Sequence, residues 1–145
     1  MPCNLVFTFF SLYSRYNVKT APEANSFTLT MTQLLEKLIN YLEACATYTG
    51  GKEKTNMVVI EVELQSGFEP TPISLKELKN NKQIKKVEYD EKTSIVALYF
   101  NEMPKEKTCY RFQIKEVIKV EDRKPAIAKI YDYYDQKDIL SIEYS

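Results

Sequence analysis

Short segments with alternating apolar and polar side chains constrain the fold of this chain more than any other feature. The clearest segment spans residues 56–64, where every second side chain is apolar. In an extended strand such side chains share one face, which packs against a core. The four that do so here are Val58, Ile60, Val62 and Leu64. This period predicts a strand that is buried on one face.

Further segments of the same kind follow along the chain, and they also predict strands. They are residues 26–32, 86–90, 94–100, 108–120, 126–134 and 139–144. The alternation in the fourth breaks at Glu116, which suggests a bulge or a bend. Short strands at such spacing are typical of a β-sandwich. We therefore expect a mainly β chain, folded as a two-sheet antiparallel β-sandwich with one short α-helix.

The short helix is expected at residues 74–81. Ser74 and Glu77 have the spacing of a capping box, in which each side chain satisfies a backbone N–H of the first turn. Ile73 before the cap and Leu78 after it form a hydrophobic staple. A helix of about two turns is marginal alone, so it must pack on a sheet. The side chains expected to make this contact are Leu75 and Leu78.

The composition argues against several classes of function. The 145 residues carry 20 basic and 20 acidic side chains, so the net basic charge of a nucleic-acid-binding protein is missing. The chain has no histidine, which removes Ser-His and Cys-His nucleophiles and most zinc sites. It has no glycine-rich phosphate loop and no apolar run of about 18 residues for membrane insertion. We expect no enzyme, cofactor or metal site. Glu61 and Glu63 would need a pocket and raised pKa values to act as acid and base, and we expect them to face water.

The cysteines leave more than one interpretation open. Cys3, Cys45 and Cys109 are an odd number, so at least one thiol is free or pairs with another chain. A Cys45–Cys109 bridge is one option, and free cysteines are the other. The apolar residues 5–13 lack a basic segment before them, and we interpret them as a strand rather than a secretory signal.

Two motifs carry a family resemblance. They are KPAIAKIYDYY at residues 124–134 and NMVVIEVELQSGF at residues 56–68. Together with Tyr48-Thr49-Gly50, Pro70 and Leu98-Tyr99-Phe100 they follow one pattern in order. This pattern resembles the C-terminal receptor-binding domain of α2-macroglobulin and related thioester proteins. The resemblance covers residues 16–145, and residues 1–15 form an atypical N-terminal segment.

The resemblance implies a non-catalytic receptor-recognition module that is secreted. It implies two partners, an endocytic clearance receptor of the low-density-lipoprotein-receptor-related class and the rest of a macroglobulin chain. The family motif GCGEQ, which carries the thioester, is absent. The chain is therefore expected to be the terminal module alone. The alternative is a structural β-sandwich domain of a thioester-type protein that has no affinity for a receptor.

The resemblance also implies a receptor-binding site made of lysines. The family uses two lysines four residues apart, and the second aligns with Lys76, whereas the first aligns with Pro72. A proline cannot replace an ammonium group, so Lys79, one turn after Lys76, is the expected second cation, and Lys82 continues the basic run. Receptors of this class hold a lysine between carboxylates that calcium organises.

Two segments are interpreted with the help of the resemblance. Residues 32–46 have leucines at helical spacing, but the resemblance requires a strand, so we expect a strand at about 40–48 and leave 32–39 open. Asp132 and Asp135 lie in the tyrosine-rich motif without the spacing of a calcium loop, and we interpret them as solvated or turn carboxylates.

Overall fold

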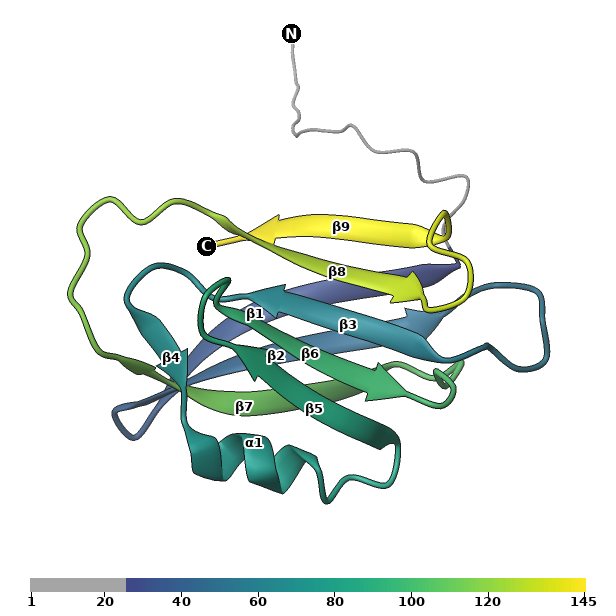
Figure 1. Ribbon diagram of the computed structural model, residues 1–145, viewed down its shortest axis with the longest axis horizontal. Coiled ribbons are helices and arrows are strands. Elements are labelled where there is room, and N and C mark those ends of the chain that lie inside the picture. The colour runs from purple at the N-terminus through teal and green to yellow at the C-terminus, as the bar shows by residue number, and fades with distance from the viewer. Residues whose placement is uncertain (1–25) are drawn as a thin grey trace, which may run out of the picture.

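The computed structural model describes residues 26–145 and consists of two antiparallel sheets and one short helix (Figure 1). The first sheet has the strand order β1-β2-β7-β4, and the second has the order β5-β6-β3-β8-β9. The expected fold class is confirmed. The elements are β1 (Phe27–Glu36), β2 (Ile39–Tyr48), β3 (Val58–Glu63), β4 (Phe68–Pro70), α1 (Pro72–Leu78), β5 (Ile84–Asp90), β6 (Ile95–Phe100), β7 (Thr108–Glu116), β8 (Ala126–Asp132) and β9 (Ile139–Tyr144).

The core lies between the two sheets and is built from alternate residues of the strands. β3 contributes Val58, Ile60 and Val62, as its sequence period predicts, and all three are fully buried. Phe100 of β6 and Phe112 of β7 are the largest fully buried side chains among the described residues. The hairpin of β5 with β6 and the pairing of β8 with β9 also match the predicted strands.

Residues 32–46 form strands, so their helical spacing of leucines is misleading. β1 and β2 pair along their whole length as a hairpin, from Phe27 opposite Tyr48 to Glu36 opposite Ile39. One of the leucines that gave the helical period, Leu38, is 92% exposed at the tip of this hairpin. The strand that we expected at about 40–48 is confirmed. Pairing with two neighbours outweighs the local helical propensity of this segment.

The helix begins earlier than predicted, because Thr71 rather than Ser74 is its N-cap. The Thr71 hydroxyl oxygen accepts a hydrogen bond of 3.4 Å from the Ser74 backbone N–H, and Pro72 occupies the first helical position. This is a favourable place for proline, which lacks the N–H that a first turn leaves unpaired. Packing through Leu78 is confirmed, since this side chain is buried, and Leu75 packs beside it.

A disulfide joins Cys45 of β2 to Cys109 of β7, which lie directly opposite each other in the first sheet. Cys45 alternates with Ala44 and Ala46, which face the core, so the bridge lies on the outer face of the sheet. Of the two alternatives that the sequence left open, a bridge or free cysteines, the structure has the bridge. The third cysteine, Cys3, lies outside the described residues, as do the atypical segment 1–15 and the strand expected at 5–13.

Two chain positions at the ends of strands have the conformation that their sequence suggests. β7 ends at Glu116, where the sequence period breaks, and Gly67 before β4 has a φ of 89°, a conformation that glycine adopts readily. Within residues 26–145, no helix is long and apolar enough to cross a membrane.

Candidate functional site

The helix α1 and the turn that follows it place three lysines in solvent. Lys76 lies within the helix, Lys79 forms its C-cap, and Lys82 lies in the turn before β5. All three side chains are exposed, whereas Leu78 on the opposite side of the helix is buried. We call these three lysines, which are the predicted site residues, the lysine edge. In Figure 1 the helix runs along one edge of the sandwich, below β7.

The helix is fixed to β7 by hydrogen bonds as well as by apolar contacts. The backbone N–H of Thr71 donates to the carbonyl of Gln113 at 2.9 Å, and the backbone N–H of Gln113 donates to the Ser74 hydroxyl at 3.0 Å. Ser74 is buried, and its hydroxyl also donates to the Thr71 carbonyl. An isolated helix of seven residues would be unstable in water. These contacts with β7 therefore determine where the lysine edge lies.

The lysine edge has no acidic partner of its own within the described residues. The ion pairs that the structure contains there involve Lys86, Arg111 and Arg123, and none of Lys76, Lys79 and Lys82. A lysine ammonium that remains hydrated on a flexible stem is free to enter an acidic pocket of another molecule. Pro72, which the resemblance aligns with the other family lysine, lies one turn before Lys76 and is exposed.

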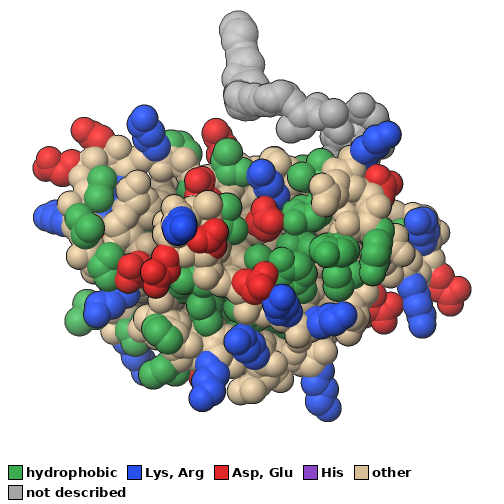
Figure 2. Space-filling model, in the orientation of Figure 1, with side chains coloured by type: hydrophobic (Ala, Val, Ile, Leu, Met, Phe, Trp, Pro, Cys, Tyr) green, Lys and Arg blue, Asp and Glu red, His purple; other side chains and the backbone are tan. Residues whose placement is uncertain are grey.

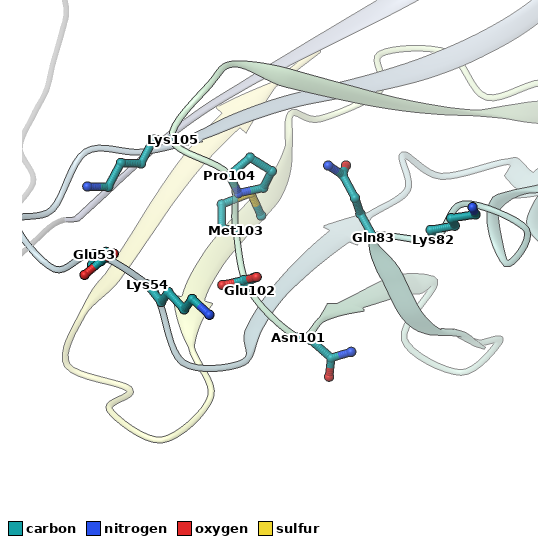
Figure 3. Close-up of a pocket in the computed structure, with 9 residues that line it drawn as sticks. All are labelled: Glu53, Lys54, Lys82, Gln83, Asn101, Glu102, Met103, Pro104 and Lys105. Atoms are coloured by element: carbon teal, nitrogen blue, oxygen red, sulfur yellow. The ribbon is translucent and has the colours of Figure 1, made fainter.

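A cleft of about 560 Å³ lies beside Lys82, between the loops that contain residues 53–54 and 101–105 (Figure 3). Its charged side chains are of both signs, since Lys54 and Lys105 are accompanied by Glu53 and Glu102. Figure 3 shows that Lys82 and Lys105 point in opposite directions. These two cations therefore do not converge on one point of the cleft.

A family model for the A-macroglobulin receptor binding domain matches residues 53–145. The chain belongs to this family. The chain is 34% identical to alpha-2-macroglobulin-like protein 1 of Mus musculus over 125 residues, and 36% identical to ovostatin of Gallus gallus over 100 residues. These matches cover 82% and 68% of the chain, but only 8% and 7% of the relatives. The chain thus spans less than a tenth of the length of either relative.

The carboxylates of this receptor-binding domain that the sequence singled out make structural contacts. Glu61 accepts a hydrogen bond of 2.9 Å from the Tyr131 hydroxyl, and Glu63 accepts one of 3.1 Å from the Ile127 backbone N–H. Both carboxylates are half-buried, so the expectation that they simply face water was incomplete. A carboxylate that accepts hydrogen bonds from its own fold holds that fold together.

The two aspartates of the tyrosine-rich motif differ from each other. Asp132 is buried and accepts hydrogen bonds from the backbone N–H groups of Tyr134 and Asp135, at 2.8 and 3.1 Å. It is a turn carboxylate, which is one of the two alternatives that the sequence left open. Asp135 is exposed and accepts a bond of 3.3 Å from Lys137, as expected of a turn residue.

Sequence reasoning missed the residues that hold the receptor-binding domain's helix in place. Thr71 caps the helix and Gln113 anchors it from β7. The sequence does contain a signal for the cap, because a threonine precedes a proline and lies three residues before Ser74. No local pattern could have identified Gln113, since it lies 39 residues away from Ser74 along the chain.

Proposed function

We propose that this domain is a receptor-recognition module that presents Lys76 and Lys79 to an endocytic receptor of the low-density-lipoprotein-receptor-related class. Lys82 extends the same basic edge. One observation carries the proposal: a short helix is fixed to β7 and presents exposed lysines without acidic partners among the described residues. Membership of a receptor-binding family supports a receptor as the partner. The domain would act outside the cell, joined to the rest of a macroglobulin chain, and without catalysing a reaction.

The recognition would depend on a compact cation entering an acidic pocket. An ammonium group on a four-carbon stem can reach between carboxylates of the receptor, which calcium holds in place. Side chains three residues apart on a helix have Cβ atoms about 5–6 Å apart, so Lys76 and Lys79 can contact one receptor repeat together. In this proposal Lys79 replaces the cation that Pro72 cannot supply.

The test is calcium-dependent binding of the domain to isolated ligand-binding repeats of such a receptor. Lys76→Ala should weaken binding by about tenfold, because it removes a charge-assisted contact, and Lys79→Ala should weaken it to a smaller extent. Lys52→Ala is the matched control, since Lys52 is an exposed lysine in the loop after β2. Binding should also weaken as salt rises, because exposed charges are screened.

A second candidate function is a structural domain without affinity for a receptor. Pro72 favours it, because a family lysine is missing at this position. Pro72→Lys distinguishes the two: restoring the cation should strengthen binding if the lysine edge is a receptor site. Equal binding by the wild type, Lys76→Ala and Pro72→Lys would leave only the structural role.

A further inference from the structure

The outer face of the five-stranded sheet carries a surface that the proposed receptor function does not use. It is the face turned to the viewer in Figure 2, where hydrophobic, acidic and basic side chains lie next to each other. Alternation along β3 turns Val59, Glu61 and Glu63 to this side, away from the core. We call it the acidic–aromatic face.

One row of side chains across this face is aromatic. Tyr99 of β6 and Tyr131 of β8 lie opposite Val59 on either side of β3. Val59 points away from the core, yet its exposure is 0%, which means that neighbouring side chains cover it. Tyr133, which follows β8, packs edge-on against Tyr99 with ring centroids 6.5 Å apart and remains 44% exposed. This row supplies an apolar surface of aromatic rings.

The next row contains two glutamates and, opposite one of them on β8, Lys129, and it has a hollow between the glutamates. Ala97 of β6 lies opposite Glu88 on one side and opposite Glu61 on the other. Neighbouring strands are about 4.8 Å apart, so the backbones of the two glutamates are about 10 Å from each other. Between them lies only the methyl group of the alanine. An open hollow of about 850 Å³ lies here, bordered also by Asp90 and Tyr99. Its other charged neighbours, Glu91 and Lys92, offset each other.

The two glutamates are held by neighbouring side chains. The Tyr131 hydroxyl donates to Glu61, and the Lys86 ammonium lies 2.9 Å from Glu88. Lys86 and the Tyr99 hydroxyl lower the pKa of Glu88 by hydrogen bonding, so this side chain stays ionised. The Lys86 ammonium also lies 5.6 Å from the centroid of the Tyr99 ring. The protein thus already places one of its own cations against a carboxylate and a ring at the border of the hollow.

We propose that the acidic–aromatic face binds an extended segment of a different protein, with an arginine side chain of that segment in the hollow above Ala97. A guanidinium group is planar and has five donors, so it can bridge two carboxylates while it stacks on an aromatic ring. Glu61, Glu88 and the ring of Tyr99 offer these partners around a small floor. An apolar residue two positions along the same segment would lie on the aromatic row, because side chains of an extended chain alternate.

The lining of the hollow is net acidic and argues for a basic partner, while Lys86 on Glu88 and Lys129 opposite Glu61 lie at its border. Among the residues that line the hollow, the four acidic side chains Glu61, Glu88, Asp90 and Glu91 outnumber the single lysine, Lys92. The lysine edge is on α1 and the turn after it, whereas this face is formed by β3, β5, β6 and β8. The inference is therefore independent of the proposed receptor function, and either can fail alone.

The probe is a peptide of sequence Ser-Leu-Ser-Arg-Ser-Leu-Ser, blocked at both ends, titrated into the ¹⁵N-labelled full chain and followed by NMR. The expected shifts centre on the backbone amides of Ala97, Glu61 and Glu88. The control peptide has citrulline in place of arginine, which keeps the shape and removes the charge. It should bind at least about fivefold more weakly, because hydrogen bonds between charged groups are roughly twice as strong as neutral ones.

Two variants test the hollow itself. Ala97→Leu fills it without a change of charge, and Glu61→Gln removes one carboxylate charge; each should weaken binding of the arginine peptide by about tenfold. Glu69→Gln is the matched control, since Glu69 is an exposed strand glutamate in the other sheet, and it should leave binding unchanged. If Ala97→Leu lowers the stability of the fold, Glu61→Gln still decides the matter.

Three results would overturn the proposal. The first is equal binding of the arginine and citrulline peptides. The second is equal binding by the wild type and Glu61→Gln, or shifts that centre on α1. The third is self-association of the wild type in analytical ultracentrifugation that Ala97→Leu abolishes, because the face would then bind a second copy of this chain.

Discussion

The side-chain amide of Asn56 donates a hydrogen bond of 3.1 Å to the buried carboxylate of Asp132. This contact joins the chain just before β3 to the end of β8, across 76 residues of sequence. The same carboxylate accepts the backbone N–H groups of Tyr134 and Asp135. Asp132 is thus the point where three separate donors of this end of the sandwich meet.

Asp132→Ala should therefore destabilise the domain. The substitution leaves the partly buried donors without an acceptor, so the free energy of unfolding should fall by about 2–3 kcal/mol. Urea denaturation followed by tyrosine fluorescence measures the change. Asp135→Ala is the control, because Asp135 is exposed, and it should cost no more than about 0.5 kcal/mol. Equal effects of the two substitutions would contradict the central role of Asp132.

The Cys45–Cys109 bridge should account for a large part of the stability. It joins residues 64 apart in sequence, and closing a loop of this length is expected to stabilise a fold by about 3–4 kcal/mol. Two proteins are compared, and both carry Cys3→Ser: one keeps the bridge, and the other also has Cys45→Ala and Cys109→Ala. Reductant should lower the free energy of unfolding of the first protein to that of the second. The second protein itself should not respond to reductant. Unchanged unfolding of the first protein in reductant would show that the bridge contributes little.

Stability should decline at alkaline pH, and Tyr144 should be one of the tyrosines responsible. Burial, and then the charge of Glu63, raises the pKa of this hydroxyl well above its ordinary value of 10.0. Below about pH 10 the hydroxyl is protonated in the folded and in the unfolded chain, and its contribution to the free energy of unfolding is fully present. Above it the unfolded chain loses the proton first, so the free energy of unfolding falls as pH rises toward the native pKa.

Tyr144→Phe tests this pH dependence. The variant loses the hydrogen bond that the hydroxyl donates to the Glu63 carbonyl, at a cost of about 1 kcal/mol near neutral pH, and its alkaline decline should be shallower. Urea denaturation at about pH 8 and about pH 11, on either side of the ordinary tyrosine pKa, separates the two effects. Tyr134→Phe is the control, since Tyr134 is largely exposed. An equally steep decline in Tyr144→Phe would assign the pH dependence to other groups.

The tip of the β1–β2 hairpin offers a stabilising change. Lys37 and Leu38 have φ values of 50° and 67°, and a positive φ at both central residues is the geometry of a two-residue turn that favours Asn-Gly. The double substitution Lys37→Asn, Leu38→Gly should raise the free energy of unfolding by about 0.5–1 kcal/mol, because positive φ is costly for other residues. Leu35→Gly, within β1, should destabilise instead. A loss of stability in the double variant would contradict this turn geometry.

The strands were predictable because each buries alternate side chains against a common core. Val58, Ile60 and Val62 show this period and all three are buried. The β1–β2 hairpin was less predictable, since Leu35 and Leu38 complete a helical period and yet are exposed. Leu35 pairs with Asn40 in the β1–β2 hairpin, and β2 in turn pairs with β7, a contact between residues far apart in sequence.

The candidate site was predictable only in part. The lysines of the lysine edge could be named from the sequence by resemblance, and their role as receptor contacts stays a prediction. The correct cap, Thr71, was hidden because Ser74 offered an equally good local motif, and only the contact with Gln113 decides between them. The acidic–aromatic face was also invisible, since Glu61, Ala97 and Glu88 become neighbours only through strand pairing.

The disulfide also determines which part of the chain bears a mechanical load. Tension applied to the chain on either side of residues 45–109 passes straight from Cys45 to Cys109 through the bridge. The segment between them, about 200 Å long if it were extended, carries none of that load. The helix α1 and the lysine edge lie within this segment. Tension between the two parts of the chain that flank residues 45–109 would therefore bypass the backbone of α1, and the lysine edge would keep its place for a partner under that load.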